Sequence, residues 1–370
     1  MRKSRAIVAG VTAVALVLSS PAIASAHGGK KPVPDPRVVS DQVVAPFNLD
    51  LSGKKVYVAD GFANMVGTLG SNGSLTPISA DPQIGASGVA NSADRRTLAF
   101  TTTEGEQEIT ASGLHIWGPR GSKVYADTLG YERAKNPDAK ITYGPNSTDP
   151  CVTGALGPAY KGLVDSHAYS VASYGKKWVV ADAGSNTLWS VDGKGKVRTL
   201  AVFPAQPLKI TAAQASALKM PSCVVGVTYR FEAVPTDVEV GRDGELYVTT
   251  LPGGPEGPEL GARGALWKVN PWNGRITKIA SGFAGATNLA IGSRGEIYVA
   301  EYFAGRISVV AHGKKSTFLA LPYVVAVESG HGGSLWAGTT IPLDPTAPQV
   351  PGTIVQIMKG HVHGKWHVKR

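Results

Sequence analysis

The feature that most constrains the fold is a short segment that recurs along the chain. Each copy reads as a strand of alternating polar and apolar residues, a turn that contains glycine, and a second strand with an aromatic residue at a fixed place. Because period-two alternation around a glycine turn is typical of paired strands, each copy predicts a β-hairpin. The clearest copies are residues 48–60, 170–182, 237–250 and 288–301.

Weaker copies at 88–102 and 326–339 raise the number of units to six, and two further strands are expected after each hairpin. Repeated four-stranded units without helical repeats between them are typical of a propeller, because each unit buries its faces only against its neighbours. We therefore predict an all-β chain, a six-bladed β-propeller of four-stranded blades, with five or seven blades as alternatives. The expected blades are residues 45–80, 81–145, 165–204, 233–283, 284–322 and 323–370, the last ending on a strand at 366–370.

The N-terminus predicts export. Arg2, Lys3 and Arg5 precede an uncharged apolar run at 6–18, and Ala-Ser-Ala at 24–26 is a sequence that signal peptidase accepts. The run is too short to span a bilayer, so we expect a secreted, extracellular monomer that does not cross a membrane. The expected domains are a signal peptide at 1–26, an N-terminal extension at 27–44 and the propeller at 45–370.

The chain has two cysteines, Cys151 and Cys223. An even pair in an exported protein predicts a disulfide. The cysteines lie in two long connections, 139–164 and 205–232, on either side of the third unit, so the bond would tie the two ends of that unit together. The second connection also contains a short capped helix, expected at 211–220.

The formal net charge is +10. This surplus fits a solvated surface, an acidic ligand or an anionic cell-envelope polymer as partner. No interleaved basic and aromatic motif accompanies it, so nucleic-acid binding is not expected.

Polar residues occur at equivalent places in the repeats. In an antiparallel blade, the start of the first strand and the end of the second lie at the same edge, so both rows should meet at one mouth of the central channel. The long connections and the loop 251–263 should emerge there too, which predicts a site for a small molecule or glycan. The alternative is that these side chains only satisfy turns and backbone groups. The strand starts are Asn48, Ser170, Asp237 and Asn288, and the strand ends are Asp60, Asp182, Thr250, Glu301 and Thr339.

Two kinds of chemistry are open to this mouth. Oxygen donors from Asp237 and Asn288, with Asn48 and Glu328, could hold a divalent cation such as calcium. His167 directly precedes the first strand of the third unit and is the candidate general acid or base, with Asp182 or Glu301 as partner. The full set of expected binding residues is Asp182, Asp237, Asn288, Glu301, Glu328, Tyr169 and Arg263.

Several longer phrases resemble the ScyD/ScyE family of exported propellers, which is named after the gene cluster for scytonemin, a cyanobacterial pigment. They include DSHAYSV at 165–171, ADAGSN at 181–186, FEAVPTDVEV at 231–240 and GFAGATNL at 282–289. The resemblance spans most of residues 40–340 and implies an exported propeller with NHL-like repeats.

A more distant resemblance is to gluconolactonase-like, strictosidine-synthase-like and streptogramin-lyase-like propellers. In the gluconolactonase group, Asn and Asp at first-strand starts hold a divalent metal, and Asp237 and Asn288 occupy that kind of position here. Ser170, Gly88 and Ala326 depart from the pattern. Three functions follow as alternatives: ligand binding, a metal-assisted hydrolase or lyase, and a cell-envelope scaffold without catalysis.

Overall fold

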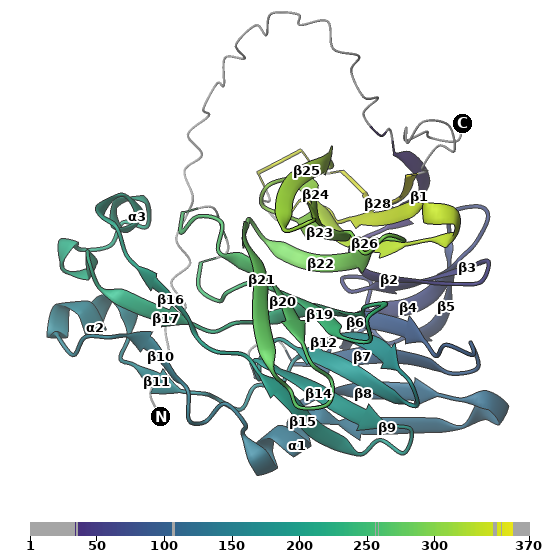
Figure 1. Cartoon of the computed structure of the whole chain (residues 1–370), viewed down its shortest axis with the longest axis horizontal. Helices are drawn as coiled ribbons and strands as arrows, with labels where there is room; N and C mark the ends of the chain where they lie inside the picture. The colour runs from purple at the N-terminus through teal and green to yellow at the C-terminus, as the bar shows by residue number, and fades with distance from the viewer. Residues whose placement is uncertain are drawn as a thin grey trace, which may run out of the picture. The chain divides into compact units, whose positions relative to one another are not determined.

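In this computed structural model, the described residues are 34, 36–105, 108–255, 257, 259–342, 346–348 and 350–357, and they form seven four-stranded antiparallel sheets (Figure 1). Six sheets, I to VI in chain order, contain the expected hairpins. Sheet I is β2 (Pro46–Ser52), β3 (Lys55–Asp60), β4 (Met65–Leu69) and β5 (Leu75–Ala80). Sheet II is β6 (Ile84–Asn91), β7 (Leu98–Glu104), β8 (Ala111–Trp117) and β9 (Lys123–Asp127). Sheet III is β12 (Ala168–Tyr174), β13 (Lys177–Asp182), β14 (Thr187–Asp192) and β15 (Val197–Val202).

The remaining three of these sheets follow the same order. Sheet IV is β18 (Pro235–Val240), β19 (Leu246–Thr250), β20 (Gly264–Val269) and β21 (Ile276–Phe283). Sheet V is β22 (Ala286–Ile291), β23 (Ile297–Glu301), β24 (Arg306–Ala311) and β25 (Lys314–Ala320). Sheet VI is β26 (Val324–Ser329), β27 (Leu335–Thr339), β28 (Gly352–Ile357) and, at its outer edge, β1 (Arg37–Val43).

The first strands of sheets I to VI line the centre of the fold. Strands β2, β6, β12, β18, β22 and β26 each contact the next, and β26 contacts β2, so that they close a ring. One hydrophobic cluster fills each junction between neighbouring sheets; Trp189, for example, is fully buried between sheets II and III. Sheets that pack face to face around a common centre are the architecture of a β-propeller.

Strand β1 closes the ring by a contact that the sequence analysis did not anticipate. It pairs with β28 from Arg37 opposite Gln356 to Val43 opposite Gly352. Part of the segment expected to be an extension, 27–44, is therefore a strand of sheet VI. The strand expected at 366–370 lies outside the described residues.

The seventh sheet, here called the insertion sheet, comes from the two long connections. Its strands, in the order β11, β10, β17, β16, are β10 (Thr142–Pro145), β11 (Tyr160–Lys161), β16 (Gln206–Lys209) and β17 (Thr228–Phe231). In Figure 1 it lies together with α2 (Pro150–Leu156) and α3 (Ala212–Ala217). The described residues thus hold seven four-stranded sheets where six blades were expected.

Two local predictions in the insertions are confirmed. Cys151 in α2 and Cys223 in the 3-10 helix η2 (Ser222–Val224) form a disulfide with their Cα atoms 6.3 Å apart. Helix α3 begins with a capping box in which Thr211 and Gln214 bond to each other's backbone N–H groups. Helix α1 (Thr128–Lys135) and the 3-10 turns η1 (Pro119–Gly121) and η3 (His331–Gly333) complete the helical elements of the described residues.

Candidate functional site

The edge of the ring at which first strands begin and second strands end is here called the loop face. The strand register brings the two together: Pro46 lies opposite Asp60, Ala168 opposite Asp182, and Ala286 opposite Glu301. Both long connections lead into first strands, β12 and β18, and the loop 251–263 joins β19 to β20. The polar rows and the long loops therefore share this face.

Carboxylates at the second-strand ends are hydrogen-bonded within their own sheets. Asp60 accepts from the backbone N–H groups of Val44, at 2.9 Å, and Ala45, at 2.7 Å. Glu301 accepts from the N–H of Ala284 at 2.7 Å and from Arg306 Nε at 3.0 Å. These two carboxylates fasten the chain that leads into the first strand.

Asp182 is the most heavily bonded of the set. It is fully buried and accepts from the backbone N–H groups of His167, at 2.8 Å, and Ser185, at 3.1 Å. It also accepts from Trp189 Nε1 at 2.7 Å and from the hydroxyl of Ser166. All of these donors are backbone or side-chain groups of the protein, so the bonds of Asp182 hold neighbouring segments of the fold together.

Residues at the first-strand starts link neighbouring sheets. Asn288 Oδ1 accepts from the N–H of Val327 at 2.7 Å, and Asn48 Oδ1 accepts from the N–H of Val89 at 3.1 Å. Asp237 Oδ2 accepts from the N–H of the next first strand, at 2.8 Å, and Oδ1 accepts from a hydroxyl of the preceding one. Burial raises the pKa of Asp237 to about 6.

These bonds bear on the expected cation at Asp237 and Asn288. Both side chains are buried, and the oxygens named for calcium already accept hydrogen bonds from protein groups. Within the described ranges, no three His, Cys, Asp or Glu side chains lie close enough together to hold a metal ion. The cation at this place stays a prediction, and the hydrogen bonds favour the structural alternative.

A row of four rings, here called the aromatic shelf, lies on the loop face and was not singled out from the sequence as a group. The Phe62 and Phe47 rings are 5.2 Å apart, Phe47 and Tyr169 are 6.0 Å apart, and Tyr169 and His167 are 5.8 Å apart. Phe47 starts sheet I and Tyr169 starts sheet III, so the row reaches past the intervening sheet II. Phe62 is 49% exposed, and the other three rings are half-buried.

Small residues make the shelf feasible. A Cβ on Gly61 would lie 2.2 Å from two ring atoms of Phe47, so glycine lets this ring lie against the backbone. In sheet II, a Cβ on Gly88 would lie 2.7 Å from the Cα of Ser170, so glycine lets the first strands of sheets II and III approach closely. Aligned repeats place Phe47 and Tyr169 at the same position, directly before the polar strand start, which is the signal that could have found them.

The position of Phe47 and Tyr169 is also the place of a recurrent β-bulge. All six first strands shift register here, for example between Pro46 and Asn48 and between Ala168 and Ser170. Bulges are over-represented beside functional sites because they redirect a side chain without ending the strand.

The His167 ring is part of the aromatic shelf, and the His167 backbone N–H donates to Asp182. Burial lowers the pKa of the imidazole, with the charge of Asp182 acting in the opposite direction. This direction favours the neutral form of the ring. The role of His167 as a general acid or base stays a prediction.

Arg263 supports the loop beside a cavity of about 260 Å³ on the same face. Its guanidinium donates to the carbonyl groups of Pro252, at 3.2 Å, and Gly253, at 3.1 Å, and stacks 4.3 Å from the ring centre of Phe231. Phe303 and several loop glycines complete the lining.

Glu328 lies elsewhere, inside the channel. A cavity of about 240 Å³ is lined by Asp50, Glu239 and Glu328 together with residues of β6 and β12. Burial, with repulsion from Asp237 and Asp50, holds the pKa of Glu239 well above the usual range. Burial, with repulsion first from Glu239, does the same for the pKa of Glu328. Asp50 accepts from Asn91 Nδ2 at 2.7 Å.

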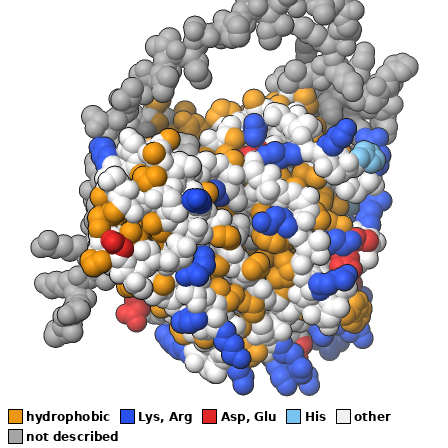
Figure 2. Space-filling view, turned by 60° about the vertical axis from the view of Figure 1, so that its left-hand side comes forward, with side chains coloured by type: hydrophobic (Ala, Val, Ile, Leu, Met, Phe, Trp, Pro, Cys, Tyr) orange, Lys and Arg blue, Asp and Glu red, His pale blue; other side chains and the backbone are white. Residues whose placement is uncertain are grey.

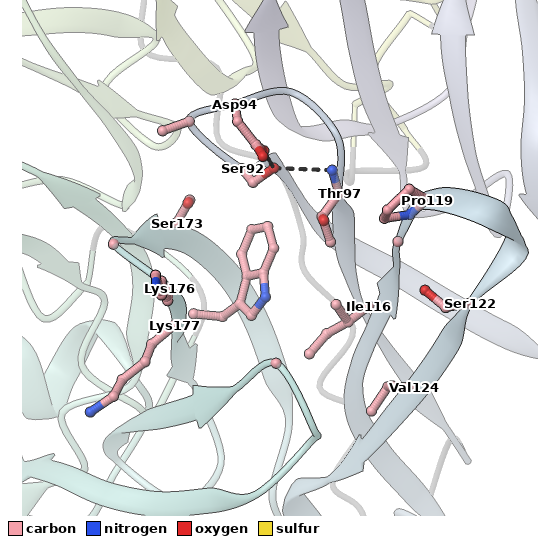
Figure 3. Close-up of a pocket in the computed structure, with 15 residues that line it drawn as sticks. Ser92, Asp94, Thr97, Ile116, Pro119, Ser122, Val124, Ser173, Lys176 and Lys177 are labelled. Atoms are coloured by element: carbon pink, nitrogen blue, oxygen red, sulfur yellow. Dashed lines mark hydrogen bonds between the residues drawn. The ribbon is translucent and has the colours of Figure 1, made fainter.

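The larger cavity of Figure 3, about 430 Å³, lies between turns of sheets II and III at the edge opposite the loop face. Ser92 Oγ donates to Asp94 at 2.6 Å and accepts from the N–H of Thr97 at 3.0 Å, while Lys176 and Lys177 line another side. Ser92, Asp94 and Thr97 are thus bonded to one another within one turn.

Comparison with known proteins identifies the fold. Family models and curated proteins give no match. Among solved structures, the chain is similar to the PQQ-bound aldose sugar dehydrogenase of Streptomyces coelicolor, with 13% identity, 88% of this chain and 99% of that chain covered, and a TM-score of 0.54. It is also similar to a glucose dehydrogenase, with 12% identity, 88% of this chain and 100% of that chain covered, and a TM-score of 0.51. Virginiamycin B lyase of Staphylococcus aureus is similar with 15% identity, 86% of this chain and 87% of that chain covered, and a TM-score of 0.47. At these identities the likeness concerns the fold.

Proposed function

We propose that this protein binds a small molecule or glycan at the aromatic shelf, where a flat, apolar face of the ligand stacks on the aromatic rings. The observation that carries the proposal is the row of rings that joins Phe62, Phe47, Tyr169 and His167 across two non-adjacent sheets. Hydrogen bonds within the fold occupy most of the polar groups at the same mouth, so stacking is the main interaction left to a ligand.

Partial exposure of the rings supports this role. Phe62 is half exposed although it contacts Phe47, so a ligand could stack on the row without displacing it. An aromatic contact contributes about 0.5–1.5 kcal/mol beyond its buried area. A cavity of about 260 Å³ lined by Arg263 and Phe303 also opens on the loop face.

The test is a binding titration with the ligands that score on a glycan and small-molecule array. Phe62→Ala should weaken binding roughly tenfold, because one exposed stacking surface is lost. Trp272→Ala is the matched control, since Trp272 is 83% exposed at the β20–β21 turn, away from the loop face. Equal affinity of both variants and the wild type would refute the shelf as the site.

A hydrolase or lyase at the same mouth is the second candidate, and the neutral imidazole of His167 favours it. His167→Gln should then abolish turnover even at ligand concentrations that saturate the variant, although loss of this ring from the shelf also weakens binding. Turnover that persists in this variant would exclude His167 as the base.

The number of blades, the export of the chain and its family also belong to this proposal. We infer six blades, formed by sheets I to VI, because six clusters fill six junctions and the insertion sheet contributes to none of them. The disulfide is consistent with export. No helix of the described residues is long and apolar enough to cross a membrane. The ScyD/ScyE relationship remains part of this proposal.

A scaffold on anionic cell-envelope polymer would use the surface rather than the shelf. Lys and Arg side chains are scattered over the face in Figure 2 and outnumber acidic ones there. Such binding should weaken steeply with salt and should be unchanged in Phe62→Ala, which separates the two functions.

A further inference from the structure

The cavity of about 430 Å³ at the edge opposite the loop face has no part in the proposed function. It is here called the turn cavity, because its lining comes from the turns β6–β7, β8–β9, β12–β13 and β14–β15 and from the strands beside them. Figure 3 shows Thr97 on one side of the hollow, Lys176 on another and Ile116 on a third. A volume of this size is in the range of small-molecule sites.

One buried side chain of the turn cavity has an unused hydrogen-bond donor. Trp178, in β13, lines the cavity although it is only 4% exposed. The other buried tryptophans of the described residues, Trp189 and Trp267, donate from Nε1 to Asp182 and Thr250. Trp178 Nε1 has no acceptor in the described part of the chain, and protein atoms do not fully enclose it. Since a buried indole N–H usually has a partner, this donor indicates a ligand that offers an oxygen atom.

Hydroxyl groups supply further donors to the same space. Thr97, Ser122 and Ser173 line the cavity, and their side chains make no hydrogen bond to another described residue. Among the described residues of the lining, Asp94 is the one carboxylate, and its Oδ1 already accepts from the hydroxyl of Ser92 at 2.6 Å. The lining therefore offers mainly hydrogen-bond donors.

The turns around this cavity, residues 92–97, 118–123, 175–177 and 192–196, carry an excess of positive charge. Against two carboxylates they have eight basic residues, all of them exposed: Arg95, Arg96, Arg120, Lys123, Lys176, Lys177, Lys194 and Lys196. None of the ion pairs in the described part of the chain involves these eight. Their charge is therefore available to an anion.

Two of the basic residues, Lys176 and Lys177, line the cavity itself. In Figure 3 the side chain of Lys177 extends outward from the hollow. Because both side chains are exposed, each can rotate toward an anion at the rim. Arg95 is directed elsewhere, since a Cβ on Gly53 of sheet I would lie 3.2 Å from its Nη1.

We propose that the turn cavity binds a phosphate ester of a small polyol, such as a glycerol phosphate. A polyol oxygen would accept from Trp178 Nε1, while the lysines at the rim balance the charge of the phosphate. Lysine commonly binds phosphate as a point charge, whereas a carboxylate is better matched by the forked guanidinium of arginine. The carbon chain would lie against Ile116 and Val124. This site is separate from the aromatic shelf and does not depend on the proposed function.

Isothermal titration calorimetry of the wild type with sn-glycerol 3-phosphate at low ionic strength tests the site. One molecule should bind per chain, and added salt should weaken binding because exposed charges are screened. Glycerol, which lacks the charge, and glycerate, which carries a carboxylate, should each bind at least tenfold more weakly. No binding of glycerol 3-phosphate, or equal binding of glycerol or glycerate, would overturn the proposal.

The double variant Lys176→Gln, Lys177→Gln should weaken binding about tenfold, because two charge-assisted hydrogen bonds are lost. Lys54→Gln, Lys55→Gln is the matched control. Lys54 and Lys55 follow the glycine of the equivalent turn of sheet I, are also exposed and do not line the turn cavity. An equal loss in both double variants would assign binding to the overall charge of the chain and refute the site.

Trp178→Phe should weaken binding about tenfold, because it removes the N–H and keeps an aromatic ring. If this variant does not fold, the indole N–H resonances of the wild type supply the second measurement: one of them should shift during the titration with glycerol 3-phosphate. Indole resonances that all stay in place would refute the assignment. Phe62→Ala should leave this binding unchanged, so the turn cavity and the aromatic shelf are tested separately.

Discussion

Replacement of Asp182 by alanine tests whether the polar rim serves the fold or a ligand. The change would leave the N–H groups of His167 and Ser185 and the indole N–H of Trp189 without their acceptor. Only the hydroxyl of Ser166 keeps another partner, Thr128. A buried donor left unpaired costs about 1–3 kcal/mol.

Three N–H donors left without an acceptor would therefore lower the free energy of unfolding by about 3–9 kcal/mol if nothing relaxed. Two effects reduce this range: loss of the Asp182 charge relieves repulsion on Glu132 and Asp165, and water can fill the vacated space. We expect a loss of about 3–5 kcal/mol in the free energy of unfolding, as is usual when one partner of a buried charged network is removed.

Guanidinium denaturation followed by fluorescence and circular dichroism measures this loss. Asp192→Ala is the matched control, because Asp192 also accepts two backbone N–H groups, from Lys194 at 2.9 Å and Lys196 at 3.0 Å, but at an exposed turn. The control should hardly move the unfolding midpoint. If Asp182→Ala lost less than about 1 kcal/mol and abolished ligand binding instead, the rim would be a binding site and the structural reasoning would be wrong.

Three further predictions concern stability. The double variant Cys151→Ser, Cys223→Ser should lose up to about 4 kcal/mol in non-reducing denaturation, because the bond closes a loop across a sequence separation of 72; no loss would mean that the insertion sheet alone holds the loop. Burial raises the folded-state pKa of Glu232 to about 7, so its proton stabilises the fold at low pH and this contribution disappears as pH rises from about 4.5 to 7. Glu232→Gln should be more stable relative to wild type at pH 8 than at pH 5; parallel pH profiles of Glu232→Gln and wild type would contradict the assignment. Deletion through the end of β1 (Arg37–Val43) should lower the melting temperature of the whole fold, since it leaves β28 as an unpaired edge; an unchanged temperature would show that β1 is dispensable.

The repeated hairpins could be predicted because their information is local. Alternation, a glycine turn and an aromatic residue fall within about a dozen residues of each other, and the strands β2–β3, β12–β13, β18–β19 and β22–β23 lie where the copies were found. The disulfide could be predicted from the number of cysteines and the expected export. The capping box at Thr211 is equally local.

Features that depend on distant partners could not be predicted. The strands of the insertion sheet are two to four residues long and carry no periodic pattern. β1 is a strand because β28 lies beside it, and nothing near Arg37 indicates that partner. The aromatic shelf requires Phe47 and Tyr169 to meet past sheet II, which depends on how the sheets pack.

The pairing of β1 with β28 has a consequence for synthesis of the chain. Arg37 leaves the ribosome about 300 residues before its partner Gln356 exists. At about 5–20 residues per second, β1 waits roughly 15 to 60 seconds without the strand that covers it. Sheets I to V can assemble in order meanwhile, but sheet VI is complete only when both ends of the chain are present. A chain that ends before β28 therefore cannot complete sheet VI, however well sheets I to V have formed.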